Sequence, residues 1–145
     1  MSHYDKDGDY INPVNGLAGL LVTDENESSR KRIISIPDSS KEEMYELTKK
    51  EFLRENGVHN GDTTKRSDVY NNLYRKMQKK DRLAAGYTLE KYERIYRQAF
   101  YDAAKKADPN WEIGKPIKDG ALDSVTRELA ESGKSPAQAT LDTKI

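Results

Sequence analysis

Hydrophobic residues recur at the spacing of an α-helix through residues 40–107, and this regularity limits the fold more than any other feature of the sequence. Side chains three or four positions apart lie on one face of a helix, so each run predicts a helix with one apolar face. Three such runs predict three helices, which short connections would pack into a bundle. The runs are Met44, Leu47 and Phe52; Val69, Leu73 and Met77; and Leu89, Tyr92, Ile95, Tyr96, Ala99, Phe100 and Ala103.

The first helix is predicted at residues 40–56 from signals at both of its ends. Ser40, with Glu43 three residues later, matches a capping box, in which each side chain bonds a backbone N–H group that the helix leaves free. Gly57 would end the helix, because glycine readily adopts the left-handed conformation that follows many helix C-termini.

The second and third helices are predicted to meet at a short turn. The second would begin near Thr64 or Ser67 and end at Gly86. Thr88 would cap the third helix, and Pro109 would end it because proline lacks the N–H group of a helical residue. With the first helix, they would form a helical core over residues 40–113.

The chain on either side of this core carries few apolar residues, and we predict extended arms there. Residues 1–39 would be an extended or partly disordered arm, in which the β-rich stretches 17–22 and 32–37 could pair as a hairpin or add to a partner's surface. Residues 114–145 would hold a short helix, capped by Asp119, and an extended C-terminal tail.

Trp111 is the single tryptophan, and we predict that it covers the open end of the helical core. So large an apolar surface would be costly to leave in water. The predicted fold class is therefore mainly α: a small three- to four-helix bundle with extended N- and C-terminal arms.

Composition indicates a small packed core within one domain. Only 34% of the 145 residues are hydrophobic, below the usual share of about 45–50%, and 34% are charged. The formal net charge is zero, but basic residues exceed acidic ones in 41–107 and acidic residues exceed basic ones at both ends. A large, deep active-site cleft is therefore not expected.

The absence of cysteine excludes disulfides, cysteine-ligated metal sites and thiol catalysis. No uncharged run is long and apolar enough for a membrane span or a secretory signal. We therefore predict a cytoplasmic location, or a virion location if the chain is a phage component, and no contact with a membrane.

The acidic stretch 5–9 resembles the start of a calcium-binding loop but lacks two residues that such a loop requires. A calcium loop needs glycine at its sixth position and glutamate at its twelfth. Counted from Asp5, these positions hold Tyr10 and Gly16. We predict a solvated acidic turn, with no metal and no cofactor.

No catalytic motif is recognisable, and catalysis is not predicted. His3 and His59 are the only histidines, and neither has a catalytic partner at a spacing that builds a proton relay. Glu90 and Glu93 are interpreted as ion-pair partners on the solvent face, with Arg94 four residues after Glu90. An enzyme is the third of three functional hypotheses, and no small-molecule substrate is expected.

Tyrosine is the unusual feature of the helical core. The chain has nine tyrosines, against two phenylalanines and one tryptophan. Tyrosine interleaved with arginine is typical of recognition surfaces, although each tyrosine could equally lie at the edge of the core with its hydroxyl in water. The predicted partner-binding residues are Tyr70, Tyr74, Arg75, Tyr92, Tyr96 and Arg97.

The first functional hypothesis follows from these features: a non-enzymatic protein that binds other proteins, or copies of itself, within a larger assembly. Its tyrosine- and arginine-rich helices would form the binding surface, and its arms would become ordered on the partner. Accessory subunits, virion structural proteins and small phage-encoded inhibitors of host machines share this architecture, which is an analogy only.

The alternative hypothesis is a nucleic-acid-binding helical module that uses the basic face of residues 75–82. Its cations could line up along phosphates. An isoelectric point near 6.8 and the acidic residues in the same segment argue against this hypothesis. The residues of the basic face are Arg75, Lys76, Lys79, Lys80 and Arg82.

Overall fold

The computed structural model describes residues 3–59 and 63–132, and it confirms a mainly α fold. Within these residues the chain forms helices and no β-strand. The elements are α1 (Glu27–Arg30), α2 (Asp38–Arg54), α3 (Thr63–Lys76), the 3₁₀ turn η1 (Lys79–Asp81), α4 (Arg82–Ala107) and α5 (Arg127–Glu131).

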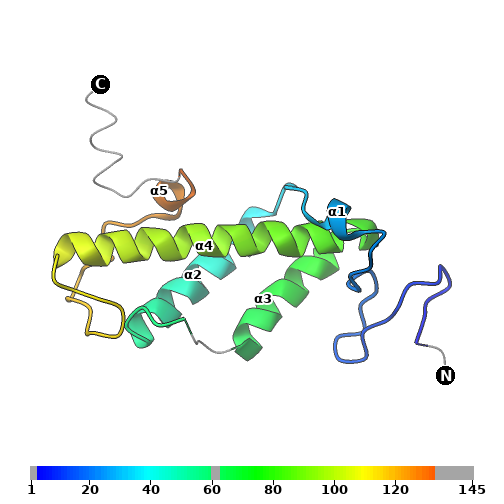
Figure 1. Ribbon diagram of the computed structural model, residues 1–145, viewed down its shortest axis with the longest axis horizontal. Helices are drawn as coiled ribbons and strands as arrows, with labels where there is room; N and C mark the ends of the chain where they lie inside the picture. Colours follow the sequence, from blue (N-terminus) through cyan, green and yellow to red (C-terminus); the bar gives the residue numbers. More distant parts are fainter. Residues whose placement is uncertain (1–2, 60–62, 133–145) are drawn as a thin grey trace.

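Helix α4 is the central element of the bundle. With 26 residues it is about 39 Å long, and α2, α3 and α5 all pack on it. Figure 1 shows α2 and α3 on one side of α4 and α5 on the other. The buried apolar side chains of all these helices meet along α4 in one core, which includes Phe52, Leu73, Leu89 and Phe100.

The predicted break between the second and third helices is wrong, because α4 continues through both Gly86 and Thr88. Gly86 lies where the Tyr74 side chain of α3 approaches α4: a Cβ atom there would be 2.5 Å from the Tyr74 hydroxyl. Thr88 also has a tertiary role, since its hydroxyl accepts a bond from the Ile34 N–H and donates to the Arg32 carbonyl, both at 3.1 Å. The chain turns earlier, at η1.

The predicted end of the first helix is confirmed, but its predicted N-cap is wrong. Helix α2 begins directly after Pro37, whose carbonyl accepts the Ser40 N–H at 3.0 Å, so Ser40 lies inside the helix and is buried. Ser40 and Glu43 therefore form no capping box. Gly57 follows the helix with φ +85°, and its N–H donates to the Phe52 carbonyl at 2.9 Å.

Trp111 is buried at the end of the core, as predicted. Its ring centroid lies 6.0 Å from that of Phe52 in α2 and 5.7 Å from that of Tyr101 in α4. Its indole N–H donates to the Lys115 carbonyl at 2.7 Å, so the loop after α4 is held over the ends of both helices.

The predicted fourth helix is shorter than expected. It is α5, capped by the Thr126 side chain and not by Asp119. The residues before Thr126 form turns. Among them, Val125 is buried, and its carbonyl accepts the Tyr45 hydroxyl at 3.1 Å. The predicted C-terminal tail at 133–145 lies outside the described residues.

The predicted hairpin of stretches 17–22 and 32–37 is absent from the described N-terminal arm. Residues 32–37 contact the helices instead: Ile36 is buried in the core, and the Ile34 N–H donates to the Thr88 hydroxyl of α4. The isolated antiparallel bridges of the arm join Tyr4 to Tyr10 and Ile11 to Ala18.

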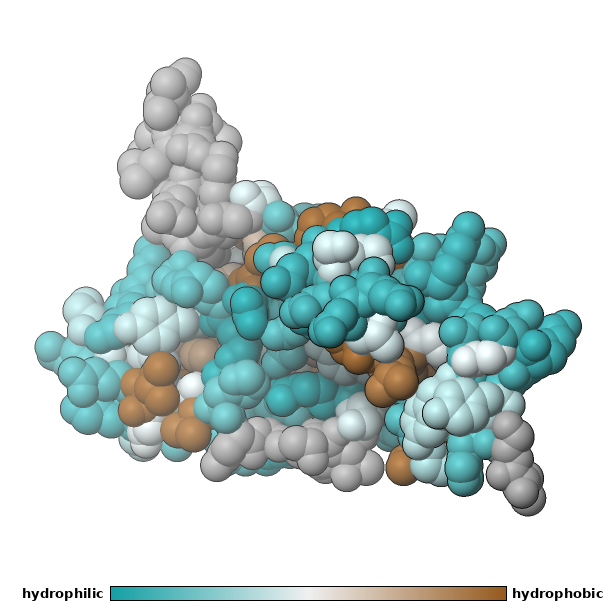
Figure 2. All heavy atoms as spheres, turned by 45° about the vertical axis from the view of Figure 1, so that its right-hand side comes forward, coloured by the Kyte–Doolittle hydropathy of each residue, from teal (hydrophilic) through white to brown (hydrophobic). Residues whose placement is uncertain are grey.

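The surface of the molecule is mostly hydrophilic, in agreement with the low apolar content of the chain. Figure 2 shows that hydrophilic side chains cover most of the face in view and that hydrophobic ones form small, separate patches. None of the helices in the described part of the chain combines the length and the apolar character that a membrane span requires.

Candidate functional site

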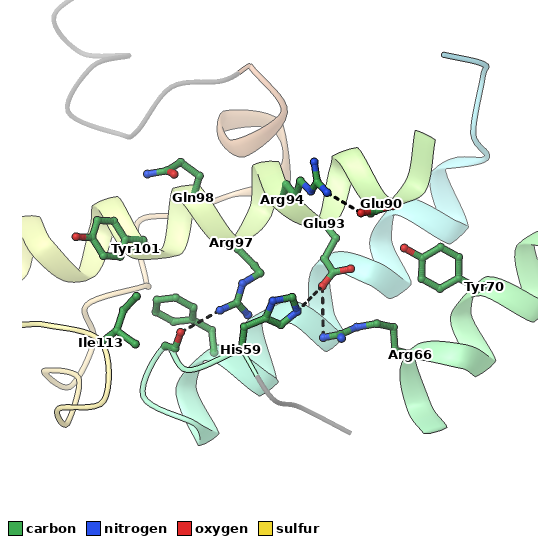
Figure 3. Close-up of a pocket in the computed structure, with 12 residues that line it drawn as sticks. His59, Arg66, Tyr70, Glu90, Glu93, Arg94, Arg97, Gln98, Tyr101 and Ile113 are labelled. Carbon is green, nitrogen blue, oxygen red and sulfur yellow. Dashed lines mark hydrogen bonds and ion pairs between the residues drawn. The ribbon is translucent and has the colours of Figure 1, made fainter. Parts of the chain in front are cut away.

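A hollow of about 850 Å³ opens beside α4, and we call it the first hollow (Figure 3). Its walls come from α4, from α3, from the end of α2 with the segment that follows it, and from the loop after α4. These elements are separated in sequence, so only the folded bundle forms the hollow. Its lining residues are Phe52, Gly57, His59, Arg66, Tyr70, Glu90, Glu93, Arg94, Arg97, Gln98, Tyr101 and Ile113.

A second hollow, of about 580 Å³, adjoins the first. Arg66, Tyr70 and Glu90 line both hollows, so the two lie side by side at α3 and α4. The second hollow reaches the N-terminal arm, where Leu20 and Val22 line it. We call the two hollows together the groove, which is elongated and open to solvent.

Two buried glutamates share one arginine at the first hollow. The guanidinium of Arg66 lies 2.5 Å from the carboxylate of Glu51 in α2 and 3.3 Å from that of Glu93 in α4. His59 Nε2 lies 3.3 Å from the same Glu93 oxygen. Both glutamates are buried, and a buried carboxylate needs a cationic partner to offset its lost contact with water. Arg66 is that partner for both, so the ion network links α2, α3 and α4.

The interpretation of Glu93 as a residue of the solvent face is therefore wrong. Glu93 follows Leu89 by four positions, which places it on the apolar face of α4, and Glu51 falls on the apolar face of α2 in the same way. This spacing is the signal that could have identified both residues. The ion pair predicted between Glu90 and Arg94 is confirmed, at 2.7 Å.

Arg97 is the arginine of the first hollow that forms no ion pair with a described carboxylate. Its Nη2 donates to the Gly57 carbonyl at 2.9 Å, and its guanidinium carbon lies 5.7 Å from the centroid of the Phe52 ring. Its Nη1 is buried and has no hydrogen-bond acceptor. Burial lowers the pKa of the Arg97 guanidinium, because water is partly removed from the charged group.

The structure brings three of the predicted partner-binding residues together in the groove: Tyr70, Tyr74 and Arg97. Burial raises the pKa of both phenols. Arg75 is exposed but lines neither hollow. The groove, and not the whole tyrosine- and arginine-rich surface, is therefore the candidate site.

The prediction of Tyr96 as a partner-binding residue is wrong. Its side chain is fully buried in the core, and its hydroxyl donates to the Glu131 carboxylate of α5 at 2.9 Å. Tyr92 is half-buried outside the groove, with the Lys41 ammonium 4.9 Å from the centroid of its ring. Both tyrosines therefore contribute to packing of the bundle.

The basic face of residues 75–82 is not a continuous strip of free cations. Lys79 is bonded to the acidic loop, residues 5–9, and Arg82 donates to two backbone carbonyls. Lys76 donates to a serine hydroxyl at 3.0 Å. Of the predicted nucleic-acid-binding residues, Lys80 and Arg75 are the most available for phosphate contacts: both are exposed, and Arg75 donates to the Asn72 side chain at 3.4 Å.

The three carboxylates of the acidic loop converge on the ammonium group of Lys79. Its Nζ lies 2.9 Å from Asp5, 2.8 Å from Asp7 and 2.6 Å from Asp9. The hydrogen bond from Lys79 lowers the pKa of Asp5, and the bonds to the aspartates raise the pKa of Lys79. The turn that we predicted from sequence thus carries a cation of its own chain, which fixes the arm beside η1.

The fold and the groove together define a small helical bundle with an open concave site lined by tyrosine and arginine. The chain belongs to the family described as a domain of unknown function (DUF3879), whose model matches residues 1–145. Neither a curated protein nor a solved structure matches the chain.

Proposed function

We propose that the chain is a protein-binding module that holds an extended segment of a partner protein in the groove. The observation that carries this proposal is the extent of the site: two adjacent open hollows share Arg66, Tyr70 and Glu90, and together their lining runs along α4 from Leu83 to Tyr101. An elongated, open site suits a polypeptide segment better than a compact small molecule, which proteins usually bind in more enclosed pockets.

The lining of the groove supports the same proposal. Tyr70 and Tyr101 offer large contact areas at a low cost in side-chain entropy, and Arg94 is exposed at the rim. Ile113 is 55% exposed and adds an apolar contact at one end. Aromatic, apolar and arginine side chains in one concave site are what protein interfaces concentrate at their centres.

Binding of nucleic acid by residues 75–82 is the weaker proposal. Most of the cations in that face are already bonded within the chain, so a phosphate backbone would have to displace those contacts. The groove, in contrast, is open without any rearrangement.

Two charge reversals of exposed arginines test the proposal. Arg94→Glu changes the rim of the groove, and Arg75→Glu makes the same change outside it. We expect proteins captured from the native host by the wild-type chain and by Arg75→Glu to be lost with Arg94→Glu. Light scattering would separately reveal self-association as a mass above 16.5 kDa.

Comparison of Arg94→Glu with Arg75→Glu gives two results that would contradict the proposal. If both variants retain the same partners as the wild-type chain, the groove is not the binding surface. If both variants lose the partners equally, binding depends on the overall surface charge and not on the groove.

A further inference from the structure

We propose that Arg97 forms a carboxylate-binding subsite in the groove, which takes an aspartate or glutamate side chain of the partner segment. This inference rests on the proposed function of the groove and adds the chemistry that the partner must carry. It depends on charge pairing, on the placement of Arg97 and on the residues around it.

Charge pairing separates Arg97 from the other cations of the first hollow. Arg66 lies within 4.0 Å of two carboxylates, and Arg94 lies 2.7 Å from one. His59 also contacts a carboxylate, at 3.3 Å. Across residues 3–59 and 63–132, no carboxylate lies that close to Arg97.

The guanidinium of Arg97 is placed to accept such a partner. Figure 3 shows it extending from α4 into the space between Ile113 and His59. One of its amino groups is held by the Gly57 carbonyl at 2.9 Å, so the side chain is already oriented, while Nη1 has no acceptor. Because Nη1 is buried, a carboxylate would supply that acceptor, through a charge-assisted bond, once the side chains that cover Nη1 move aside.

The surroundings of Arg97 specify what should accompany the acidic residue. Phe52 lies against the guanidinium, and Tyr101 and Ile113 line the same end of the groove. These side chains give that end of the groove apolar walls, which would strengthen a charged contact. We therefore expect the partner segment to carry an apolar or aromatic residue beside its aspartate or glutamate.

Two blocked dipeptides test this subsite, because each has no terminal charge. Ac-Phe-Glu-NH2 carries the proposed carboxylate, and Ac-Phe-Gln-NH2 replaces it with a neutral group of the same shape. Binding can be followed through the NMR signal of the Trp111 indole N–H, since the Trp111 ring contacts Phe52 and Tyr101 of the first hollow. We expect the glutamate peptide to bind about tenfold more tightly.

Matched variants assign the preference to Arg97. Arg97→Gln should bind the two dipeptides equally, whereas Arg75→Gln should keep the preference for glutamate, because Arg75 is exposed and lines neither hollow. The dispersion of the NMR spectrum reports whether each variant is folded. If Arg97→Gln does not fold, Arg97→Lys keeps the charge but loses the two-pronged geometry, and its preference should fall several-fold.

The outcomes separate this inference from the proposed function. Equal binding of both dipeptides to the wild-type chain would overturn the carboxylate subsite and leave groove binding intact. Failure of both dipeptides to bind would also overturn the subsite, and the partner-capture experiment with Arg94→Glu would still decide the function of the groove. Inorganic phosphate that displaces Ac-Phe-Glu-NH2 at equal concentration would reassign Arg97 to phosphate groups.

Discussion

The hydroxyl of Tyr74 lies where a substituent at position 86 would be, and this contact sets how closely α3 approaches α4. A Cβ atom at Gly86 would be 2.5 Å from that hydroxyl. Replacing a helical glycine by alanine normally stabilises a helix by up to about 1 kcal/mol. We expect Gly86→Ala instead to lower the free energy of unfolding by about 1–2 kcal/mol, because the overlap forces the tyrosine ring to move. Urea denaturation measures this change.

A second substitution distinguishes overlap from other causes. Tyr74→Phe removes the hydroxyl, and the next ring atoms would lie 3.4 Å from the new Cβ atom. In the Tyr74→Phe background, Gly86→Ala should therefore cost less than in the wild-type chain. A Gly86→Ala protein more stable than the wild type would show that the ring moves freely.

The buried ion network predicts strong coupling between Glu51 and Arg66. Removing one member of a buried pair leaves an uncompensated charge, at a cost of about 3–5 kcal/mol. We expect Glu51→Leu and Arg66→Leu each to destabilise the fold, and the double variant to be less destabilised than the sum of the two. The exposed pair Glu90 and Arg94 is the control, with an expected coupling below about 1 kcal/mol.

The burial of apolar residues could be predicted from sequence, but the burial of charged residues could not. Trp111 is buried as expected, because no other arrangement removes so large a side chain from water. Glu93 lies on an equally predictable apolar face, yet a carboxylate is tolerated there only because Arg66 arrives from another helix. That partner depends on how the helices pack, so the candidate site could not be predicted from spacing alone.

The boundary between α3 and α4 could not be predicted from local sequence signals. Glycine at position 86 and threonine at 88 are common signals for a helix end and a new N-cap, and they suggested a turn. The buried positions Ala85 and Leu89 on either side instead keep α4 continuous, because packing outweighs the intrinsic cost of one glycine. The three long helices and their apolar faces were predictable, but this boundary was not, and neither was the short helix α1 within the predicted extended arm.

Docking of the N-terminal arm depends on one lysine. Lys79→Met should release the acidic loop, because its three carboxylates would repel one another without the ammonium group. We expect faster cleavage of the arm in limited proteolysis, with little change in the helical body. Lys80→Met is the control, since this neighbouring lysine is exposed. Equal cleavage rates in the two variants would contradict this role of Lys79.

The same contact gives arm docking a pH dependence with a definite sign. The pKa of Asp5 is lowered from its usual value of 3.8 when the arm is docked. The contribution of Asp5 is therefore complete above that value and is lost as the pH falls through the lower pKa of the docked state. The protection factors of the arm amides, which correct hydrogen exchange for its intrinsic rate at each pH, should fall under acid conditions, and much less in Lys79→Met.

The whole molecule should unfold as one unit, because α2, α3 and α5 all pack on the same central helix. We expect the loss of helical circular dichroism and the change in Trp111 fluorescence to follow a single denaturation curve. The tryptophan reports on the end of the core formed by α2 and α4, far along α4 from Gly86. Two separated transitions would show that α3 and the arm form an independent unit.

The close approach at Gly86 also carries an evolutionary consequence. Two positions that share so little space cannot change independently: a larger residue at 86 requires a smaller one at 74. Among relatives of this chain we therefore expect these two positions to covary in size, with tyrosine at 74 found only together with glycine at 86.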